Sequence, residues 1–287
     1  MFQALLFIFP DYSKLFISGF ILFLFTSSEC VTAQGNLLIT PKRIVFEGQK
    51  RSQDINLANI GNDTARYEVS FIQIRMKEDG NFEQITQPDS GQFFADKNLR
   101  LFPRVVTLGP NEAQLIKIQV SHANKLSPGE YRSHLYFRAV PNKDPLGETP
   151  VKADTAGVSV RIVPVFGISI PVIIRAGEST AKVSLSRLEL EGLSDSLQVM
   201  KVRFNRTGNF SVYGDLKIEH ISENGKITQV GHIKGISVYA PNLKRDVKVN
   251  LDHKPGVNYR SGKLLVSYAS STEGQTEPMA WAELLLK

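Results

Sequence analysis

The feature that most constrains this 287-residue chain is an unbroken alternation of apolar residues over positions 158–174. Successive side chains of an extended strand point to opposite faces, so every second residue shares a face. Strands in globular proteins usually run to about five or six residues, and this run is roughly three times as long. We therefore expect part of it to cross between domains or to offer its edge to another chain. The apolar residues at the even positions are Val158, Val160, Ile162, Pro164, Phe166, Ile168, Ile170, Val172 and Ile174.

Residues 1–33 read as an export signal. Lys14 is followed by the apolar run LFISGFILFLF, and the small residues Val31-Thr32-Ala33 then offer a cleavage site before Gln34. A membrane anchor is the alternative, but the apolar run is short for a span of about 20 residues. The only cysteine, Cys30, falls inside this signal, so the mature chain would have none. An exported protein of this size does not need disulfides if its cores are large enough.

The rest of the chain has the pattern of an all-β protein. Short alternating segments such as 43–48, 66–75 and 131–140 are separated by Gly, Pro, Asn and Asp, and no long amphipathic helix stands out. Even spacing of such segments favours a β-sandwich. The formal net charge is +6, but the basic residues are scattered. We read this charge as solubility and electrostatic steering rather than nucleic-acid binding.

A short motif occurs twice in the same order. Tyr131-Arg132-Ser133 recurs as Tyr259-Arg260-Ser261, each just after a Pro-Gly pair. The spacing before Tyr131 resembles a tyrosine corner, in which a tyrosine at the start of a late strand bonds back to the preceding loop. The repeat predicts two sandwiches of similar topology in tandem. We place the first domain at 34–175 and the second at 176–287.

The sequence shows no group of residues that is typical of a catalytic or metal-binding site. No two of the five histidines have ligand-like spacing, and no cysteine supports them in a metal site. No nucleophile-elbow, phosphate-loop or dinucleotide motif is present. We therefore predict no catalytic residue, no metal and no cofactor. These residues give little support to an enzyme or a carbohydrate-binding module.

Arg43 is the basic residue that stands out among apolar neighbours, beside Ile44 and Val45. A guanidinium stays charged and forms a two-pronged pair with a carboxylate, so it suits the capture of a chain terminus. An ordinary solvated base on a strand is equally compatible with the spacing.

Three ordered segments together resemble the periplasmic pilus chaperones of the chaperone–usher pathway, the PapD-like family, in a divergent form. They are the P-x-R-x-x-F-x-G pattern at 41–48, the segment FPRVVTLGPNEAQLIKI at 102–118, and PGEYRSHLYFRAVP at 128–141, which the long alternating strand follows. The resemblance is strongest from residue 37 to about 175. Residues 178–287 match the family only loosely.

The resemblance implies two immunoglobulin-like β-sandwich domains in tandem, in a boomerang arrangement. The long strand would be the last strand of the first domain and would donate itself to a pilin-like subunit that lacks a strand. The implied partners are these subunits and an outer-membrane usher that receives them, and the implied location is the periplasm. By position, the donated side chains would be Val158, Val160, Ile162, Phe166 and Ile168.

The resemblance also implies a basic anchor for the carboxyl terminus of the subunit. Arg43 matches the family's arginine on the first strand, whereas the lysine near the end of the long strand aligns with Ser169 or Pro171. Ser169 can still supply a neutral hydrogen bond. Arg161 and Arg175 share the odd-numbered face of the strand and are candidates to compensate.

Two further possibilities stay open. The chain can be a secreted or surface structural protein whose long strand merely bridges two immunoglobulin-like domains, with no subunit client. The free protein can also associate with itself through the apolar strand, which would hide its edge.

Overall fold

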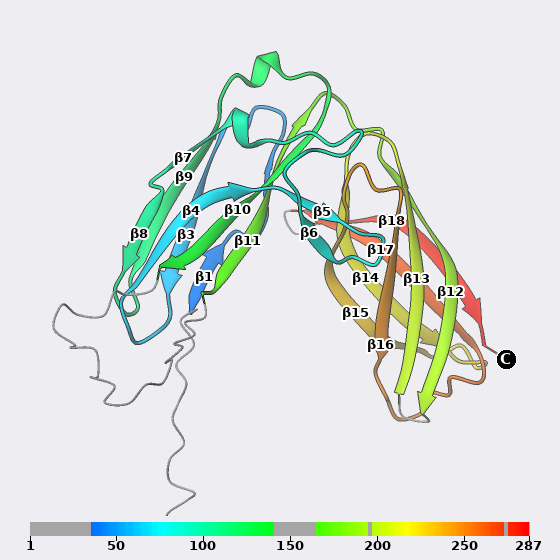
Figure 1. Ribbon diagram of the computed structural model, residues 1–287. Coiled ribbons are helices and arrows are strands. Elements are labelled where there is room, and N and C mark those ends of the chain that lie inside the picture. The colour runs from blue at the N-terminus through cyan, green and yellow to red at the C-terminus, as the bar shows by residue number, and fades with distance from the viewer. Residues whose placement is uncertain (1–35, 141–164, 195–196, 273–274, 287) are drawn as a thin grey trace, which may run out of the picture. The chain divides into compact units, whose positions relative to one another are not determined.

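The first half of the chain folds into two facing β-sheets (Figure 1). The computed structural model describes residues 36–140, 165–194, 197–272 and 275–286. One sheet has the order β1-β3-β9-β7 and the other β2-β11-β10-β4-β8. We call this pair of sheets the first sandwich. Its strands are β1 (Leu37–Thr40), β2 (Ile44–Phe46), β3 (Ser52–Asn59), β4 (Ala65–Ile72), β7 (Leu99–Phe102), β8 (Val105–Leu108), β9 (Ala113–Val120), β10 (Gly129–Val140) and β11 (Gly167–Ala176).

The alternation of the sequence decides which side chains form the core of the first sandwich. In β3, Ile55 and Leu57 are buried while the residues between and before them are polar and exposed or half-buried, and in β9 Ile116 and Ile118 are buried on either side of the exposed Lys117. These residues pack with Leu135 and Phe137 of the facing sheet in one hydrophobic cluster. Burial of the even positions of β11 (Ile170, Val172 and Ile174) completes this core.

The beginning of the chain changes sheets between β1 and β2. β1 pairs antiparallel with β3 in one sheet, whereas β2 pairs parallel with β11 in the other. Pro41, Lys42 and Arg43 lie in the bend between the two strands. A proline has no backbone N–H, so Pro41 is suited to ending a ladder. Arg43 therefore belongs to this bend, and not to the first strand, where the family resemblance places it.

The second half of the chain forms a second pair of sheets with the orders β12-β13-β16 and β15-β14-β17-β18. We call it the second sandwich. Its core is a separate hydrophobic cluster to which both sheets contribute, with Phe204 from one and Tyr268 from the other in edge-to-face contact. Its strands are β12 (Lys182–Ser194), β13 (Leu197–Thr207), β14 (Val212–Ile221), β15 (Ile227–Val238), β16 (Lys244–Leu251), β17 (Lys263–Thr272) and β18 (Gln275–Leu285).

Both tyrosines of the repeated motif bond back to the preceding loop. The Tyr131 hydroxyl donates to the Ser127 carbonyl at 3.1 Å, and the Tyr259 hydroxyl donates to the Asp252 carbonyl at 2.8 Å. Burial raises the pKa of Tyr259 to about 12, which keeps this donor protonated. The tyrosine corner predicted at Tyr131 is confirmed, and its counterpart occurs in the second sandwich.

The prediction of an all-β protein built of two sandwiches is confirmed. In the described residues, the only helical elements are two short 3-10 turns, η1 (Asp96–Asn98) and η2 (Ala123–Lys125). None of the helical segments in these residues has the length and apolar character needed to cross a membrane. A small hairpin of β5 (Ile74–Met76) and β6 (Phe82–Gln84) stands apart from the main sheets.

Candidate functional site: an open strand edge and a cationic pocket

β11 has one edge that is only partly covered. β10 pairs with it along its whole length, from Arg138 opposite Gly167 to Gly129 opposite Ala176. On the other side, β2 pairs only with Val172–Ile174. In the described part of the chain, no strand pairs with this side of Gly167–Pro171. We call Gly167–Pro171 the open edge.

The register identifies the backbone groups that the open edge presents. The Ala139 N–H donates to the Phe166 carbonyl at 3.0 Å, so the even-numbered residues of this strand direct their backbone groups toward β10. Gly167, Ser169 and Pro171 therefore direct theirs away from β10. Gly167 and Ser169 present both N–H and C=O, whereas Pro171 presents only its C=O. This placement explains how a proline fits here, because its missing N–H lies on the unpaired side.

Gly167 is required by a side chain of the neighbouring strand. A Cβ atom at this position would lie 2.3 Å from the side chain of Tyr136. The phenol ring of Tyr136 thus lies directly over the backbone of the open edge and covers the place where a side chain would otherwise stand.

The apolar row of β11 continues beyond the core. Ile170 is buried, but Ile168 and Phe166 on the same face are 38% and 45% exposed. These two are the predicted donor residues that the structure describes, and both are available for contact with another molecule. Val158, Val160 and Ile162 lie outside the described residues, as does Arg161.

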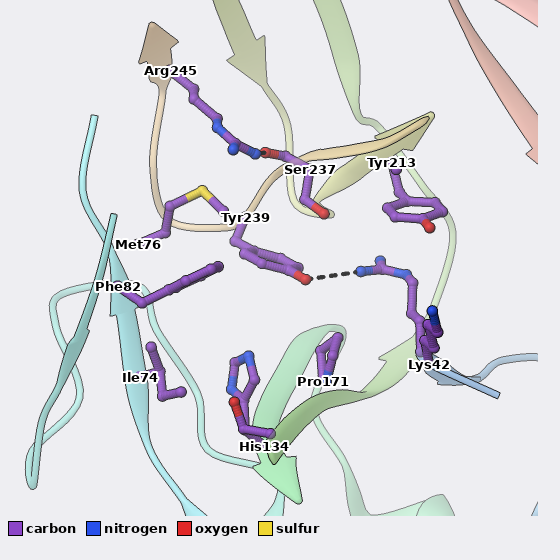
Figure 2. A pocket seen from close by; sticks show the side chains of 13 residues that line it. Lys42, Ile74, Met76, Phe82, His134, Pro171, Tyr213, Ser237, Tyr239 and Arg245 are labelled. Carbon is purple, nitrogen blue, oxygen red and sulfur yellow. Dashed lines mark hydrogen bonds between the residues drawn. The ribbon is translucent and has the colours of Figure 1, made fainter. Parts of the chain in front are cut away.

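A cavity of about 280 Å³ lies at the end of the open edge (Figure 2). Ser169 and Pro171 belong both to its wall and to the open edge. Thus the two residues predicted as a carboxylate anchor, Arg43 and Ser169, line the same cavity. The first sandwich and the β5–β6 hairpin contribute Lys42, Arg43, Ile74, Met76, Phe82, His134, Ser169 and Pro171, and the second sandwich contributes Tyr213, Gly235, Ser237, Tyr239 and Arg245.

The electrostatics of the cavity favour an anion, because its wall includes Lys42, Arg43 and Arg245 but no acidic residue. Nη1 of Arg43 donates a hydrogen bond to the Tyr239 hydroxyl, with 3.2 Å between the nitrogen and the oxygen. The guanidinium carbon lies 4.5 Å from the centre of the Tyr213 ring. Within the described residues, Arg43 forms no ion pair with a carboxylate. These contacts orient the guanidinium and leave its charge uncompensated.

A second guanidinium lies behind Tyr239. Arg132 of β10 is 4% exposed, and its Cζ lies 4.0 Å from the centre of the Tyr239 ring. Its Nε and Nη1 have no hydrogen-bond partner among the described residues, and neither does Nε of Arg245. Burial lowers the pKa of Arg132, an effect that the charge of Arg43 reinforces. The positive potential in this region therefore comes from two sandwiches at once.

His134 belongs to the neutral part of the wall. Burial, with smaller contributions from the charges of Arg132 and Arg43, lowers the pKa of His134 to about 3. The imidazole is therefore neutral at ordinary pH. Its ring packs edge-on to Phe82 and Tyr239, with centroids 6.2 and 6.4 Å away.

Arg175, considered as a substitute for the missing lysine, is already engaged. Its guanidinium contacts Glu47 at 3.2 Å and Glu130 at 3.3 Å and donates to the Ser211 carbonyl at 2.9 Å. The other cations of the cavity wall are Lys42 and Arg245, and Arg132 lies behind Tyr239. Arg132 had a signal in the sequence, since it shares a face of its alternating strand with His134, whereas nothing near Arg245 or Tyr239 pointed to this site.

Solved structures that are similar to this chain include several chaperones. No family model matches this chain, and no curated protein is similar enough in sequence to match it. A YadV chaperone is 13% identical with a TM-score of 0.44, over 88% of this chain and 100% of that one. The CupB2 chaperone of Pseudomonas aeruginosa is 15% identical with a TM-score of 0.42, over 87% and 100%.

A chain from the Salmonella enterica complex of the SafA pilin with the SafB chaperone is 12% identical, with a TM-score of 0.40, over 87% of this chain and 96% of that one.

Proposed function

We propose that this protein is a chaperone of pilus subunits that captures an extended segment of its client by strand addition to β11. The open edge supplies backbone groups at Gly167, Ser169 and Pro171, and the cavity supplies cations at its end. The observation that carries the proposal is that Ser169 and Pro171 belong to both. An added strand would therefore run directly into an anion-binding cavity, which suits a carboxyl terminus.

The position of β2 supports one direction for the bound segment. β2 already occupies the edge from Val172 onward, so an added strand must end near Pro171, beside Arg43. If its end is a carboxylate, the segment runs from Gly167 toward Pro171 and lies parallel to β11. The apolar side chains of Phe166 and Ile168, and Val158, Val160 and Ile162 before them, would then fill a groove in the client.

The wider biological role follows from the same proposal. Residues 1–33 direct export to the periplasm, and residues 34–175 and 176–287 form the two domains of the chaperone. Covering the apolar groove and the free sheet edge of a subunit prevents aggregation until an outer-membrane usher receives it. Binding by strand addition needs neither a cofactor nor a catalytic residue, since release can proceed through exchange for a better-packed strand.

The test is recovery of clients from the native periplasm with a tagged protein. We expect small β-rich subunits in about one-to-one ratio, identified by mass spectrometry. Ile168→Asp should reduce recovery at least tenfold, because burial of an isoleucine contributes about 1.5–3 kcal/mol. Leu115→Asp is the matched control, since Leu115 is 59% exposed on β9, in the other sheet.

Two results would count against capture by the open edge. One is equal recovery with Ile168→Asp and Leu115→Asp. The other is a self-dimer with no client under fibre-expressing conditions, which would assign the edge to self-association and favour a structural protein.

A further inference from the structure

One side of the cavity is apolar and does not contribute to binding a carboxylate. Ile74, Met76 and Phe82, all from the β5–β6 hairpin, form an apolar wall, and Phe82 is 56% exposed. Figure 2 shows these three side chains on the side of the cavity opposite Lys42 and Tyr213, with Tyr239 between the two sides. An exposed phenylalanine in a cavity wall gains free energy only when an apolar group covers it.

The apolar wall is held in place from two directions. The Asn242 side-chain amide donates to the Met76 carbonyl at 2.6 Å, and the Asp246 N–H donates to the Glu78 carbonyl at 2.6 Å. On the other side, Nε of Arg75 donates to Asp89 at 2.6 Å. The hairpin is therefore fixed to the second sandwich and to the loop after β6, and its wall is preformed.

The tip of the hairpin is shaped to accept Arg245. Gly80 has φ +84°, a left-handed conformation that glycine adopts readily. A Cβ atom at Gly80 would lie 2.8 Å from the Arg245 guanidinium. The close approach places a cation of the second sandwich against the hairpin that forms the apolar wall.

The size of the cavity limits what can occupy it. About 280 Å³ is at the lower end of the range of small-ligand pockets, roughly 300–1,000 Å³. It has room for a terminal residue and excludes a folded segment. With the carboxylate at Arg43, the rest of the cavity is bordered by Tyr239, His134 and Phe82, whose rings pack against one another and present one joined aromatic surface.

We infer that the β5–β6 hairpin forms a side-chain subsite for the last residue of the bound segment and selects an apolar, above all aromatic, side chain at the client's carboxyl terminus. This inference rests on the strand capture proposed above. Its occupant is the end of a polypeptide, because the open edge leads an extended chain into the cavity through Ser169 and Pro171.

The experiment measures binding of fluorescent peptides to the full mature protein by anisotropy. The peptides share one sequence of alternating apolar and polar residues and end in Phe, Ala or Glu, each as the free acid, with a Phe-amide as the fourth. We expect the Phe acid to bind about tenfold more tightly than the Ala acid, the order expected for an apolar group in a partly open pocket. The Glu acid tests the alternative that Arg245, which lies against the same hairpin, accepts a second carboxylate: binding tighter than that of the Phe acid would overturn the apolar subsite.

Variants separate the side-chain subsite from the anchor. Phe82→Ala should bring the Phe-to-Ala affinity ratio close to one, whereas Arg43→Ala should bring the acid-to-amide ratio close to one. Phe102→Ala is the control for the first, since Phe102 is 78% exposed on β7 and does not line the cavity. Arg100→Ala, an exposed arginine of the same strand, is the control for the second.

The outcomes distinguish the two levels of the inference. Binding of all free acids with equal affinity would overturn the side-chain subsite and leave the strand capture intact. A Phe preference that survives Phe82→Ala would also overturn the subsite. Absence of binding for every peptide would overturn the strand capture, and the subsite with it.

Discussion

Glu130 is expected to contribute more to the stability of this protein than any exposed carboxylate. Its side chain is 1% exposed, and its Oε2 accepts hydrogen bonds from the Ser211 N–H at 2.9 Å and the Ser211 hydroxyl at 2.7 Å. Oε2 also contacts Nε of Arg175 at 3.3 Å. Glu130 is the second residue of β10 in the first sandwich, and Ser211 precedes β14 of the second. The carboxylate therefore connects the two.

Replacing Glu130 with alanine removes these three contacts together. Breaking a buried ion pair by deleting one partner costs about 3–5 kcal/mol. Arg175 keeps Glu47 and the Ser211 carbonyl, so its charge does not become isolated. The buried Ser211 N–H does lose its acceptor, which costs about 1–3 kcal/mol. We expect a loss of about 3 kcal/mol in the free energy of unfolding, or roughly 6–12 °C in Tm for a chain of this size.

Urea unfolding followed by two probes tests this estimate. Circular dichroism reports both sandwiches, whereas Trp281, the only tryptophan, lies in β18 and reports the second. In Glu130→Ala we expect the two transitions to separate, because the connection between the sandwiches is lost. Glu47→Ala is the control, with an expected loss below about 1 kcal/mol for a carboxylate that is 59% exposed. A Glu130→Ala protein within about 1 kcal/mol of the wild type, with coincident transitions, would refute the reasoning.

Two further predictions concern a hydrogen bond and a buried ring. Tyr131→Phe and Tyr259→Phe should each lose about 1 kcal/mol of unfolding free energy in urea, because each removes a bond to a loop carbonyl; unchanged midpoints for both would show that the corners do not stabilise the fold. The lowered pKa of His134, about 3 against 6.5 for a free histidine, means that the unfolded chain takes up the proton first as the pH falls. Stability should therefore decrease below pH 6.5, by about 1.4 kcal/mol per pH unit until the folded pKa is approached. His134→Leu should reduce this slope between pH 6 and pH 5 by one proton, and an identical slope in both proteins would contradict the assignment.

The strand architecture and part of the candidate site could be predicted from the sequence. Alternation of apolar residues is a local property, so it predicted the sandwich strands and the buried positions of β11. The spacing before Tyr131 predicted the tyrosine corner because that turn is short, and the repeated Tyr-Arg-Ser motif predicted two sandwiches in tandem. Arg43 and Ser169 were placed together only through the family resemblance, since 126 residues separate them in the sequence.

The rest of the site depends on contacts that no local pattern encodes. Arg245 and Tyr239 reach the cavity from the second sandwich, where the resemblance to known chaperones is weakest. The engagement of Arg175 could not be predicted, because its partners Glu47, Glu130 and Ser211 come from three distant segments. The length of the open edge also could not be predicted from the sequence, because it depends on where β2 starts to pair with β11.

Pro171 fixes the position at which the N–H donors of the open edge end. Along Gly167–Pro171, the proposed parallel guest strand would find N–H donors at Gly167 and Ser169 and would then meet a residue that cannot donate. An ordinary peptide carbonyl at that last step would remain without a backbone partner, whereas a terminal carboxylate there would pair with the Arg43 guanidinium, which lines the same cavity. The proline would thus favour a guest strand that terminates at this position. A guest whose chain continues past Pro171 would lose a hydrogen bond, and one whose chain ends there would gain a charge pair.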